Sequence, residues 1–164
     1  MNSENFEENL KKMQVYCDVR ERCVQDVRNK LTKLKIPDNE HFKYIKRLQS
    51  SQLLNEDRFC RAFIHDKTLI NKWGVNKIIF ELQKRDISDK QIQSNIHYLN
   101  KEDNELVLRK LLRAKKQVTA GGNTYEIRNK LYRYALSRGF LPDEINLCLN
   151  QIMGPQQRYS QMGF

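Results

Sequence analysis

Basic side chains dominate the chemistry that this sequence can support. Its 164 residues include 30 lysines and arginines against 20 aspartates and glutamates, which gives a formal net charge of +10. The excess gathers between Glu105 and Phe140, where nine basic residues stand against two acidic ones. This balance predicts a polyanionic partner, either nucleic acid or an acidic protein surface. The alternative is a solvated helix face, which is what most charged runs are.

Three of these basic residues, Arg109, Arg113 and Lys116, step by four and then three positions and so predict one face of a helix. Lys130 and Arg133 are expected to share a face of the following helix. If the two faces meet in one groove, they form a track for phosphates or for an acidic filament surface. The full set of expected DNA- or filament-binding residues is Arg109, Lys110, Arg113, Lys115, Lys116, Arg128, Lys130 and Arg133.

The opposite face of the first of these helices is expected to be buried, and it consists of Val107, Leu111, Ala114 and Val118. A helix that reads base sequence needs donors on its exposed face. The last predicted helix, Asp143 to Met153, contains no lysine or arginine. We therefore expect contact with the DNA backbone, on single and double strands alike, without recognition of sequence.

No residues have the spacing of a catalytic or metal-binding site. The four cysteines, Cys17, Cys23, Cys60 and Cys148, include no C-x-x-C pair, and the three histidines are equally dispersed. The sequence also contains no glycine-rich phosphate loop and no nucleophile elbow. We expect a protein without enzymatic activity, cofactor or metal, with free cysteines in a reducing cytoplasm.

The hydrophobic segments are too short to cross a membrane, since none approaches the ~18 residues that a span requires. The segment Met1–Glu8 is acidic and polar, unlike a secretory signal. We expect a cytoplasmic monomer that has no membrane partner.

The elements that position these side chains show an internal repeat. Apolar residues recur around Ile36, Ile87 and Phe140, which lie 51 and 53 residues apart, at offsets of −9, −5, +5, +9 and +12. Fourteen of these fifteen positions are apolar, and His41 is the exception. Such a period is typical of stacked supersecondary units, because each unit must bury the same face.

Each unit is predicted to consist of three helices, with the repeats at 1–52, 53–100 and 101–153 and a disordered tail at 154–164. Asn55 and Ser88 are expected to cap helix amino termini, and Gly139 to follow a helix carboxyl terminus. The fold class is therefore all-α: three tandem three-helix repeats that form an elongated, curved helical array.

The middle repeat resembles a known family. The segments Leu54–Ile64, Trp73–Leu82 and Ile87-Ser88 are similar to the motifs of the RecX family of recombination regulators, and Arg138-Gly139-Phe140 resembles the end of that family's third repeat. The likeness covers roughly residues 15 to 153.

The chain departs from the family pattern at three positions. Val75 stands where proline is usual, Cys60 where alanine is usual, and Asp86 where glycine is usual. Aspartate can replace glycine at a left-handed helix end at modest cost, so these departures hardly disturb the resemblance.

The resemblance implies a bacterial protein that binds the RecA recombinase filament and modulates its strand exchange, ATPase and coprotease activities. Inhibition is the expected direction, and stimulation stays open. Such proteins act in DNA recombination, DNA repair and the SOS response. Arg58, Lys72, Trp73 and Lys77 lie in or beside the motifs and are expected to bind the partner, although a core or hinge role for Trp73 stays open. The alternative reading is a stand-alone helical protein that binds nucleic acid without sequence preference.

Overall fold

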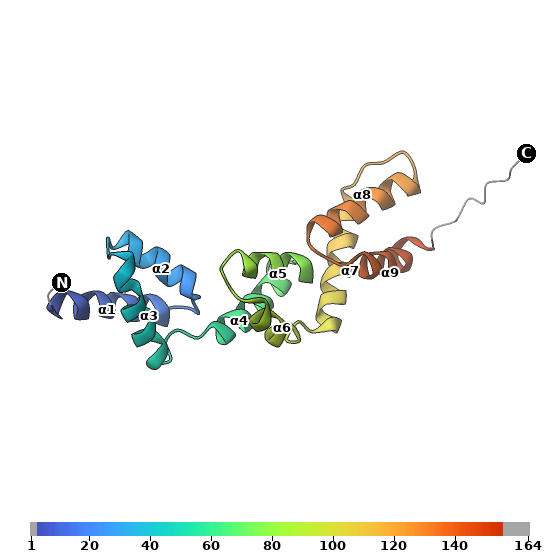
Figure 1. Cartoon of the computed structure of the whole chain (residues 1–164). Helices are drawn as coiled ribbons and strands as arrows, with labels where there is room; N and C mark the ends of the chain where they lie inside the picture. Colours follow the sequence, from blue (N-terminus) through green and yellow to red (C-terminus); the bar gives the residue numbers. More distant parts are fainter. Residues whose placement is uncertain (1–2, 156–164) are drawn as a thin grey trace, which may run out of the picture. The chain divides into compact units, whose positions relative to one another are not determined.

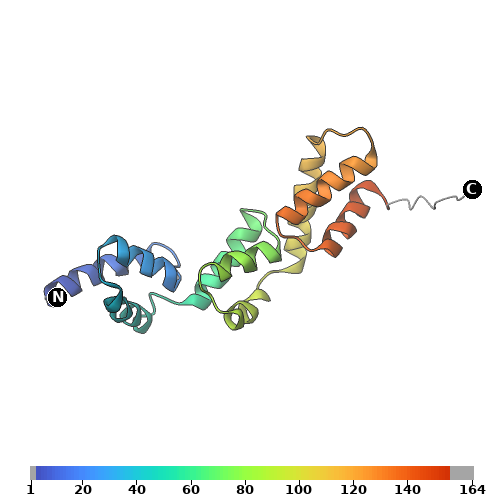
Figure 2. The ribbon, with the colours of Figure 1, turned by 45° about the horizontal axis from the view of Figure 1, so that its top comes forward.

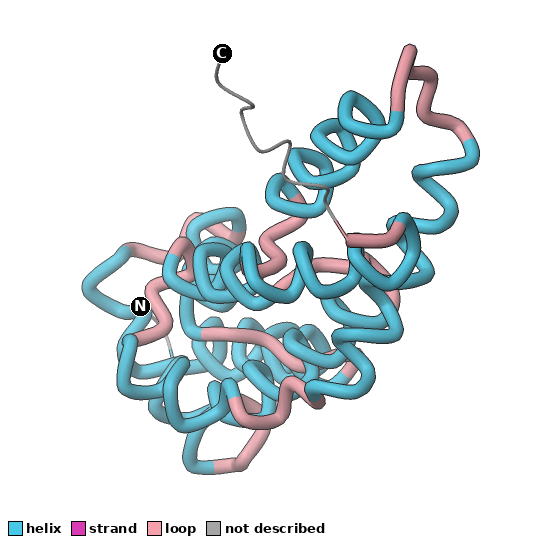
Figure 3. Tube along the Cα trace, turned by 90° about the vertical axis from the view of Figure 1, so that its right-hand side faces the viewer, coloured by secondary structure: helices cyan, strands magenta, loops and turns pink. Residues whose placement is uncertain are grey.

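The computed structural model describes residues 3–155, and within this range the chain forms α-helices and no strand (Figures 1 and 3). The prediction of an all-α fold is confirmed. The predicted tail lies outside the described residues, apart from Gly154 and Pro155. In chain order the helices are α1 (Ser3–Asp18), α2 (Val24–Lys33), α3 (Asp38–Ser50), α4 (Glu56–Leu69), α5 (Val75–Gln83), α6 (Asp89–Ile96), α7 (Lys101–Gln117), α8 (Thr124–Ser137) and α9 (Pro142–Met153).

One turn occurs three times, after α2, α5 and α8. In each case a residue with positive φ precedes a buried apolar residue: Lys35 at 57°, Asp86 at 58° and Gly139 at 89°. The amide of the buried residue donates to the carbonyl five positions earlier, at 3.1 Å after α2 and at 3.3 Å after α5 and α8. The amide before it donates to the carbonyl three positions earlier, at 2.9 Å in all three turns. This pairing satisfies carbonyls that the helix end would otherwise leave unpaired.

The buried residues of these turns are the three positions around which the sequence repeats. Ile36, Ile87 and Phe140 are 5%, 3% and 0% exposed. The residues nine and five positions earlier are all 0% exposed: Val27, Leu31, Ile78, Leu82, Leu131 and Ala135. The apolar spacing therefore marks a backbone motif and the core positions that accompany it. The boundaries of the three repeats stay a prediction.

His41 occupies the one polar position of the repeat and is nevertheless 2% exposed. Its Nε2 lies 2.9 Å from the carbonyl oxygen of Ile36, so the ring has a hydrogen-bond partner inside the core. A buried polar group with a partner is tolerated where an unpaired one would be costly, which explains how histidine replaces an aliphatic residue here.

The predicted helix ends are also confirmed where the structure tests them. The side-chain oxygen of Asn55 accepts from the Arg58 amide at 3.0 Å, and that of Ser88 accepts from the Gln91 amide at 3.3 Å. Asp86 adopts the left-handed conformation that the family pattern gives to glycine.

The chain divides into two compact units, one of residues 1–64 and 81–98 and the other of residues 65–80 and 99–164. In the first unit, α1, α2 and α3 lie side by side (Figure 1). Their shared core includes Met13, Leu31, Tyr44 and Leu48. A carboxylate oxygen of Glu56, at the start of α4, accepts from the Val24 amide at 3.0 Å and so completes the amino terminus of α2.

In the second unit, α7, α8 and α9 pack on one another (Figures 1 and 2). Their core includes Leu108, Leu112, Leu131 and Leu149. The prediction for the buried face of α7 was partly wrong. Val107 and Leu111 are buried as expected, but Ala114 and Val118 are exposed. The physical reason is that α7 contacts both α8 and α9, which turns Leu108 and Leu112 inward, and that the helix ends at Gln117.

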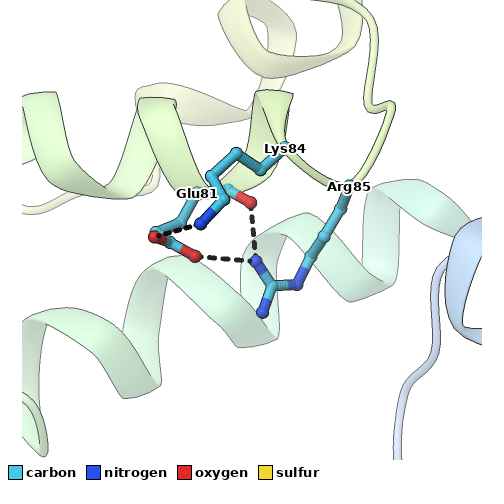
Figure 4. Close-up of polar contacts among 3 residues, drawn as sticks. All are labelled: Glu81, Lys84 and Arg85. Carbon is cyan, nitrogen blue, oxygen red and sulfur yellow. Dashed lines mark hydrogen bonds and ion pairs between the residues drawn. The ribbon is translucent and has the colours of Figure 1, made fainter.

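A compact charge cluster closes the carboxyl end of α5 (Figure 4). Nη1 of Arg85 donates to the Glu81 carboxylate at 3.1 Å and to the Glu81 carbonyl at 2.7 Å, and Nζ of Lys84 lies 3.4 Å from the same carboxylate. The guanidinium of Arg85 also lies 5.0 Å from the ring centre of Phe63. The hydrogen bond from Arg85 is the main cause that lowers the pKa of Glu81.

Because folding lowers the pKa of Glu81, its contribution to stability is present above the pKa of the unfolded chain and is lost as the pH falls through the folded pKa. We expect Glu81→Gln to reduce the free energy of unfolding by up to ~1 kcal/mol at neutral pH. The difference from wild type should shrink below the ordinary glutamate pKa of about 4.3. Urea denaturation across this pH range measures the difference, with Glu7→Gln, at an exposed position of α1, as the charge-matched control. A difference in unfolding free energy between Glu81→Gln and wild type that does not depend on pH would contradict a lowered pKa of Glu81.

Leu82 is expected to be one of the residues whose truncation harms the fold most, because its side chain is 0% exposed. Leu82→Ala should leave a cavity and lower the free energy of unfolding by ~2–5 kcal/mol. Val118→Ala, on a side chain that is 76% exposed, should stay within ~0.5 kcal/mol of wild type. Urea denaturation followed by the helix signal in circular dichroism compares the two variants.

Candidate nucleic-acid and filament interface

The predicted basic face of α7 lies partly against α9. Arg109 is half-buried, and its Nε is buried without a hydrogen-bond partner in the described structure. Nζ of Lys116 donates to the carbonyl of Ile152 at 3.3 Å. Burial raises the pKa of the Cys148 thiol on α9, and the positive charges of Arg109 and Arg113 oppose that rise. Arg109, Arg113 and Lys116 therefore all border α9. Arg113 and Lys116 are exposed, whereas Arg109 is half-buried.

The predicted residues of α8 divide in the same way. Lys130 and Arg133 are exposed, and Nζ of Lys130 donates to the Ala120 carbonyl in the α7–α8 loop at 2.6 Å. Arg128 is instead buried, and its guanidinium donates to Asn150 Oδ1 at 2.7 Å and to the Gly154 carbonyl at 3.2 Å. Arg128 thus ties α8 to the carboxyl end of α9, where a cation is favourable.

The two basic faces follow different helix pairs. Arg109 and Lys116 lie beside α9, while Lys130 reaches the loop that joins α7 to α8. The exposed members of the predicted set are Lys110, Arg113, Lys116, Lys130 and Arg133. Lys116 and Lys130 each donate to a backbone carbonyl, and exposed lysines and arginines can reach phosphate oxygens.

Of the four residues that the family motif suggested for partner binding, Arg58 has a clear internal role. Its Nε lies 2.7 Å from the Glu21 carboxylate, and its Nη2 donates to the Gln52 carbonyl at 2.8 Å. These contacts fasten α4 to the segments before α2 and after α3. Lys72 is exposed and has a positive φ of 55°.

Trp73 and Lys77 belong to an arrangement that sequence reasoning missed. Two half-buried aromatic rings each have two cations nearby. Nζ of Lys67 and Nζ of Lys77 lie 5.0 Å and 4.7 Å from the ring centre of Trp73. The Lys115 ammonium and the Arg138 guanidinium lie 5.0 Å and 5.4 Å from the ring centre of Tyr134.

Sequence spacing held part of this signal. Tyr134 and Arg138 are four residues apart at the end of α8, and side chains at that spacing meet on a helix. Trp73 precedes α5, so helix spacing does not explain its contact with Lys77. Lys115 comes from a different helix than Tyr134, so spacing alone could not have found it.

A backbone contact joins the segment before α5 to the turn after α8, within the second unit. The Gly74 amide donates to the Arg138 carbonyl at 2.9 Å, and the Asn76 amide donates to the Gly139 carbonyl at 3.0 Å. A Cβ atom on Gly74 would overlap the backbone of Gly139 and Phe140, and one on Gly139 would overlap Lys77. Both glycines are thus required by the close approach of the two segments.

We expect Gly74→Ala to lower the free energy of unfolding by about 1–3 kcal/mol, because the added methyl group must push two backbone segments apart. Gly122→Ala is the matched control, since a Cβ there meets only the end of the Glu126 side chain, at 3.4 Å. Thermal or urea denaturation of the two variants makes the comparison. Equal stabilities would show that the close approach is not needed.

The buried thiols are not nucleophiles at neutral pH. Burial raises the pKa of Cys17 and Cys60 to about 11 and that of Cys23 to about 12, so the three remain protonated. Among residues 3–155, no three histidine, cysteine, aspartate or glutamate side chains gather in a way that could hold a metal ion. None of the described helices is both long and apolar enough to span a bilayer.

Fold and surface together define a protein of tandem three-helix units with a basic carboxyl-terminal repeat. Residues 55–94 match the sequence model of the second three-helix domain of RecX, and residues 104–149 match that of the third. The two matches together cover just over half of the chain. The chain belongs to the RecX family, as the motifs of its middle repeat predicted.

Individual relatives agree with this. The regulatory protein RecX of Clostridium botulinum (strain Alaska E43 / Type E3) is 33% identical over 137 residues, which are 79% of this chain and 61% of that protein. The regulatory protein RecX of Prosthecochloris aestuarii is 25% identical over 138 residues, or 84% of this chain and 89% of that protein. The chain thus matches less than two thirds of the clostridial relative.

Solved structures share the fold. The crystal structure of RecX from Lactobacillus salivarius superposes with a TM-score of 0.80 at 16% sequence identity, over 92% of this chain and 98% of that one. A second crystal structure of regulatory protein RecX gives a TM-score of 0.79 at 15% identity, over 87% of this chain and 72% of that one.

Proposed function

We propose that this chain binds the filament that RecA recombinase forms on DNA and modulates RecA activity, with inhibition as the expected direction. The observation that carries the proposal is the match of residues 55–94 and 104–149 to the second and third three-helix domains of RecX. The relatives are named regulatory proteins, so a regulatory role follows from the family, and RecA is the partner that we infer for it.

The DNA contact is proposed to run through the exposed cations of the third repeat, with Lys110, Arg113 and Arg133 as its principal members. All three are exposed, and none forms an ion pair with a carboxylate in the described part of the chain. Helix α9 carries no lysine or arginine with which to read base edges. Contact with phosphates alone makes binding independent of DNA sequence.

The proposed mode of action is binding without catalysis, by a cytoplasmic monomer built from repeats at 1–52, 53–100 and 101–153. A regulator of this kind changes RecA by preferring one state of the filament, because a ligand shifts an equilibrium only through its differential affinity. The second candidate function is a stand-alone nucleic-acid-binding protein, which the net charge of +10 favours equally.

The test of the proposed function is the rate of ATP turnover by RecA on single-stranded DNA as the purified chain is added. We expect turnover to fall with increasing chain, while the chain alone hydrolyses no ATP and cuts no DNA. Unchanged turnover, together with DNA binding by the chain, would favour the stand-alone function instead.

Phosphate contact gives a further expected result, because binding to duplex DNA releases counterions. Affinity should fall with salt at ~0.9 log units per contact per log unit of salt. The triple variant Lys110→Gln, Arg113→Gln and Arg133→Gln should flatten that slope by up to about three contacts. Helicity should change little, since glutamine, lysine and arginine have similar helix propensities.

The matched control changes three exposed cations of the first unit, Lys33→Gln, Lys43→Gln and Arg47→Gln, and so removes the same net charge elsewhere. Salt titrations on two unrelated duplexes compare both triple variants with wild type. Equal flattening by the two variants would mean that net charge, rather than the third repeat, determines binding.

A further inference from the structure

In the second unit, cations lie near the rings of Trp73 and Tyr134, and a backbone hydrogen bond connects the two sites. We call Lys67, Trp73, Lys77, Lys115, Tyr134 and Arg138 the ring–cation surface. Arg138 is the link: its carbonyl accepts from the amide of Gly74, next to Trp73, and its guanidinium lies over Tyr134. Nη1 of Arg138 also donates to the carbonyl of Asn71 at 3.4 Å.

We propose that the ring–cation surface binds unpaired DNA, with bases stacked on Trp73 and Tyr134 and phosphates held by the flanking cations. The choice of DNA over RNA rests on the proposed function. This surface shares no residue with the Lys110, Arg113 and Arg133 set, and none of those three cations lies over an aromatic ring within residues 3–155.

Three cations of this surface are available to a ligand. Lys77, Lys115 and Arg138 form no ion pair with any carboxylate of the described residues. Arg85 differs from these three cations, because its guanidinium donates a hydrogen bond to the Glu81 carboxylate (Figure 4). Cations that contact a ring instead of an acid keep their positive charge for an incoming anion.

The rings decide what kind of polyanion fits. Trp73 and Tyr134 are half-buried, so each is held by the fold and still presents part of its surface to solvent. A base stacks on an aromatic ring more strongly than an exposed ammonium does, so a base can displace Lys77 from Trp73. The displaced ammonium is then free to meet the phosphate beside that base.

Double-stranded DNA cannot use the rings in this way, because its bases are already stacked inside the helix. An acidic protein surface would pair with the cations but would leave both rings without a function. Alternating rings and cations are the arrangement with which proteins bind single strands without sequence preference.

Trp73 makes a direct test possible, because it is the only tryptophan of the chain. The full chain is titrated with oligo(dT), with a duplex of matched phosphate concentration, and with poly-glutamate, while tryptophan fluorescence is recorded. We expect oligo(dT) to quench the fluorescence strongly and the other two polyanions to leave it nearly unchanged. Equal quenching by the duplex or by poly-glutamate would overturn the proposal.

Variants separate the rings from the charges. Binding of dye-labelled oligo(dT), followed by anisotropy, should weaken about 5- to 100-fold for Trp73→Leu and for Tyr134→Leu, with the salt slope unchanged. Trp73→Phe keeps a ring and should bind nearly as wild type does. Replacing Lys77 and Lys115 by glutamine should flatten the slope by up to ~0.7 per lost phosphate contact. Wild-type affinity in Trp73→Leu would contradict base stacking.

Two further measurements keep the outcome clear. Circular dichroism of each variant reports whether it folds, and the fluorescence titration of wild type needs no variant. Oligo(U) that binds more tightly than oligo(dT) would overturn the assignment to DNA. Because RecA is absent, quenching by oligo(dT) alongside unchanged RecA turnover would support this surface and count against the proposed function.

Discussion

A left-handed backbone residue, placed before a buried apolar side chain, determines how the second and third helices of every repeat meet. It ends one helix, satisfies two of its terminal carbonyls and turns Ile36, Ile87 or Phe140 into the core. Lysine and aspartate hold this conformation in the first two turns at a cost of ~1–2 kcal/mol each. Only the third turn has glycine, and there a second constraint applies, because a side chain at Gly139 would overlap Lys77.

The close approach at Gly139 also positions the ring–cation surface. The approach of Gly74 to Gly139 brings Trp73, from the segment before α5, next to Arg138, at the end of α8. Segments more than sixty positions apart in the sequence are thereby joined by backbone hydrogen bonds within the second unit. A turn that exists to close a helix thus also positions aromatic and basic side chains, so the same two glycines serve stability and the presentation of charge.

Sequence reasoning succeeded where a signal was periodic or local. The recurring offsets located the core, and Asn55, Asp86 and Gly139 followed from the chemistry of helix ends. It failed where contacts between helices determine which side chains are buried. Arg128 looks like any other basic residue of its run, yet the carboxyl end of α9 buries it. Val118 fits the apolar spacing of α7 but lies beyond the helix end, which spacing alone does not define.

The bond from Val24 to Glu56 has a consequence for how autonomous the repeats can be. Glu56 lies in the segment predicted as the second repeat, yet it completes the first turn of α2. A fragment cut between the two repeats would leave that helix end without its acceptor and Glu21 without Arg58. The sequence is modular, but the start of α4 supplies contacts on which the first three helices depend, so neighbouring units share an interface.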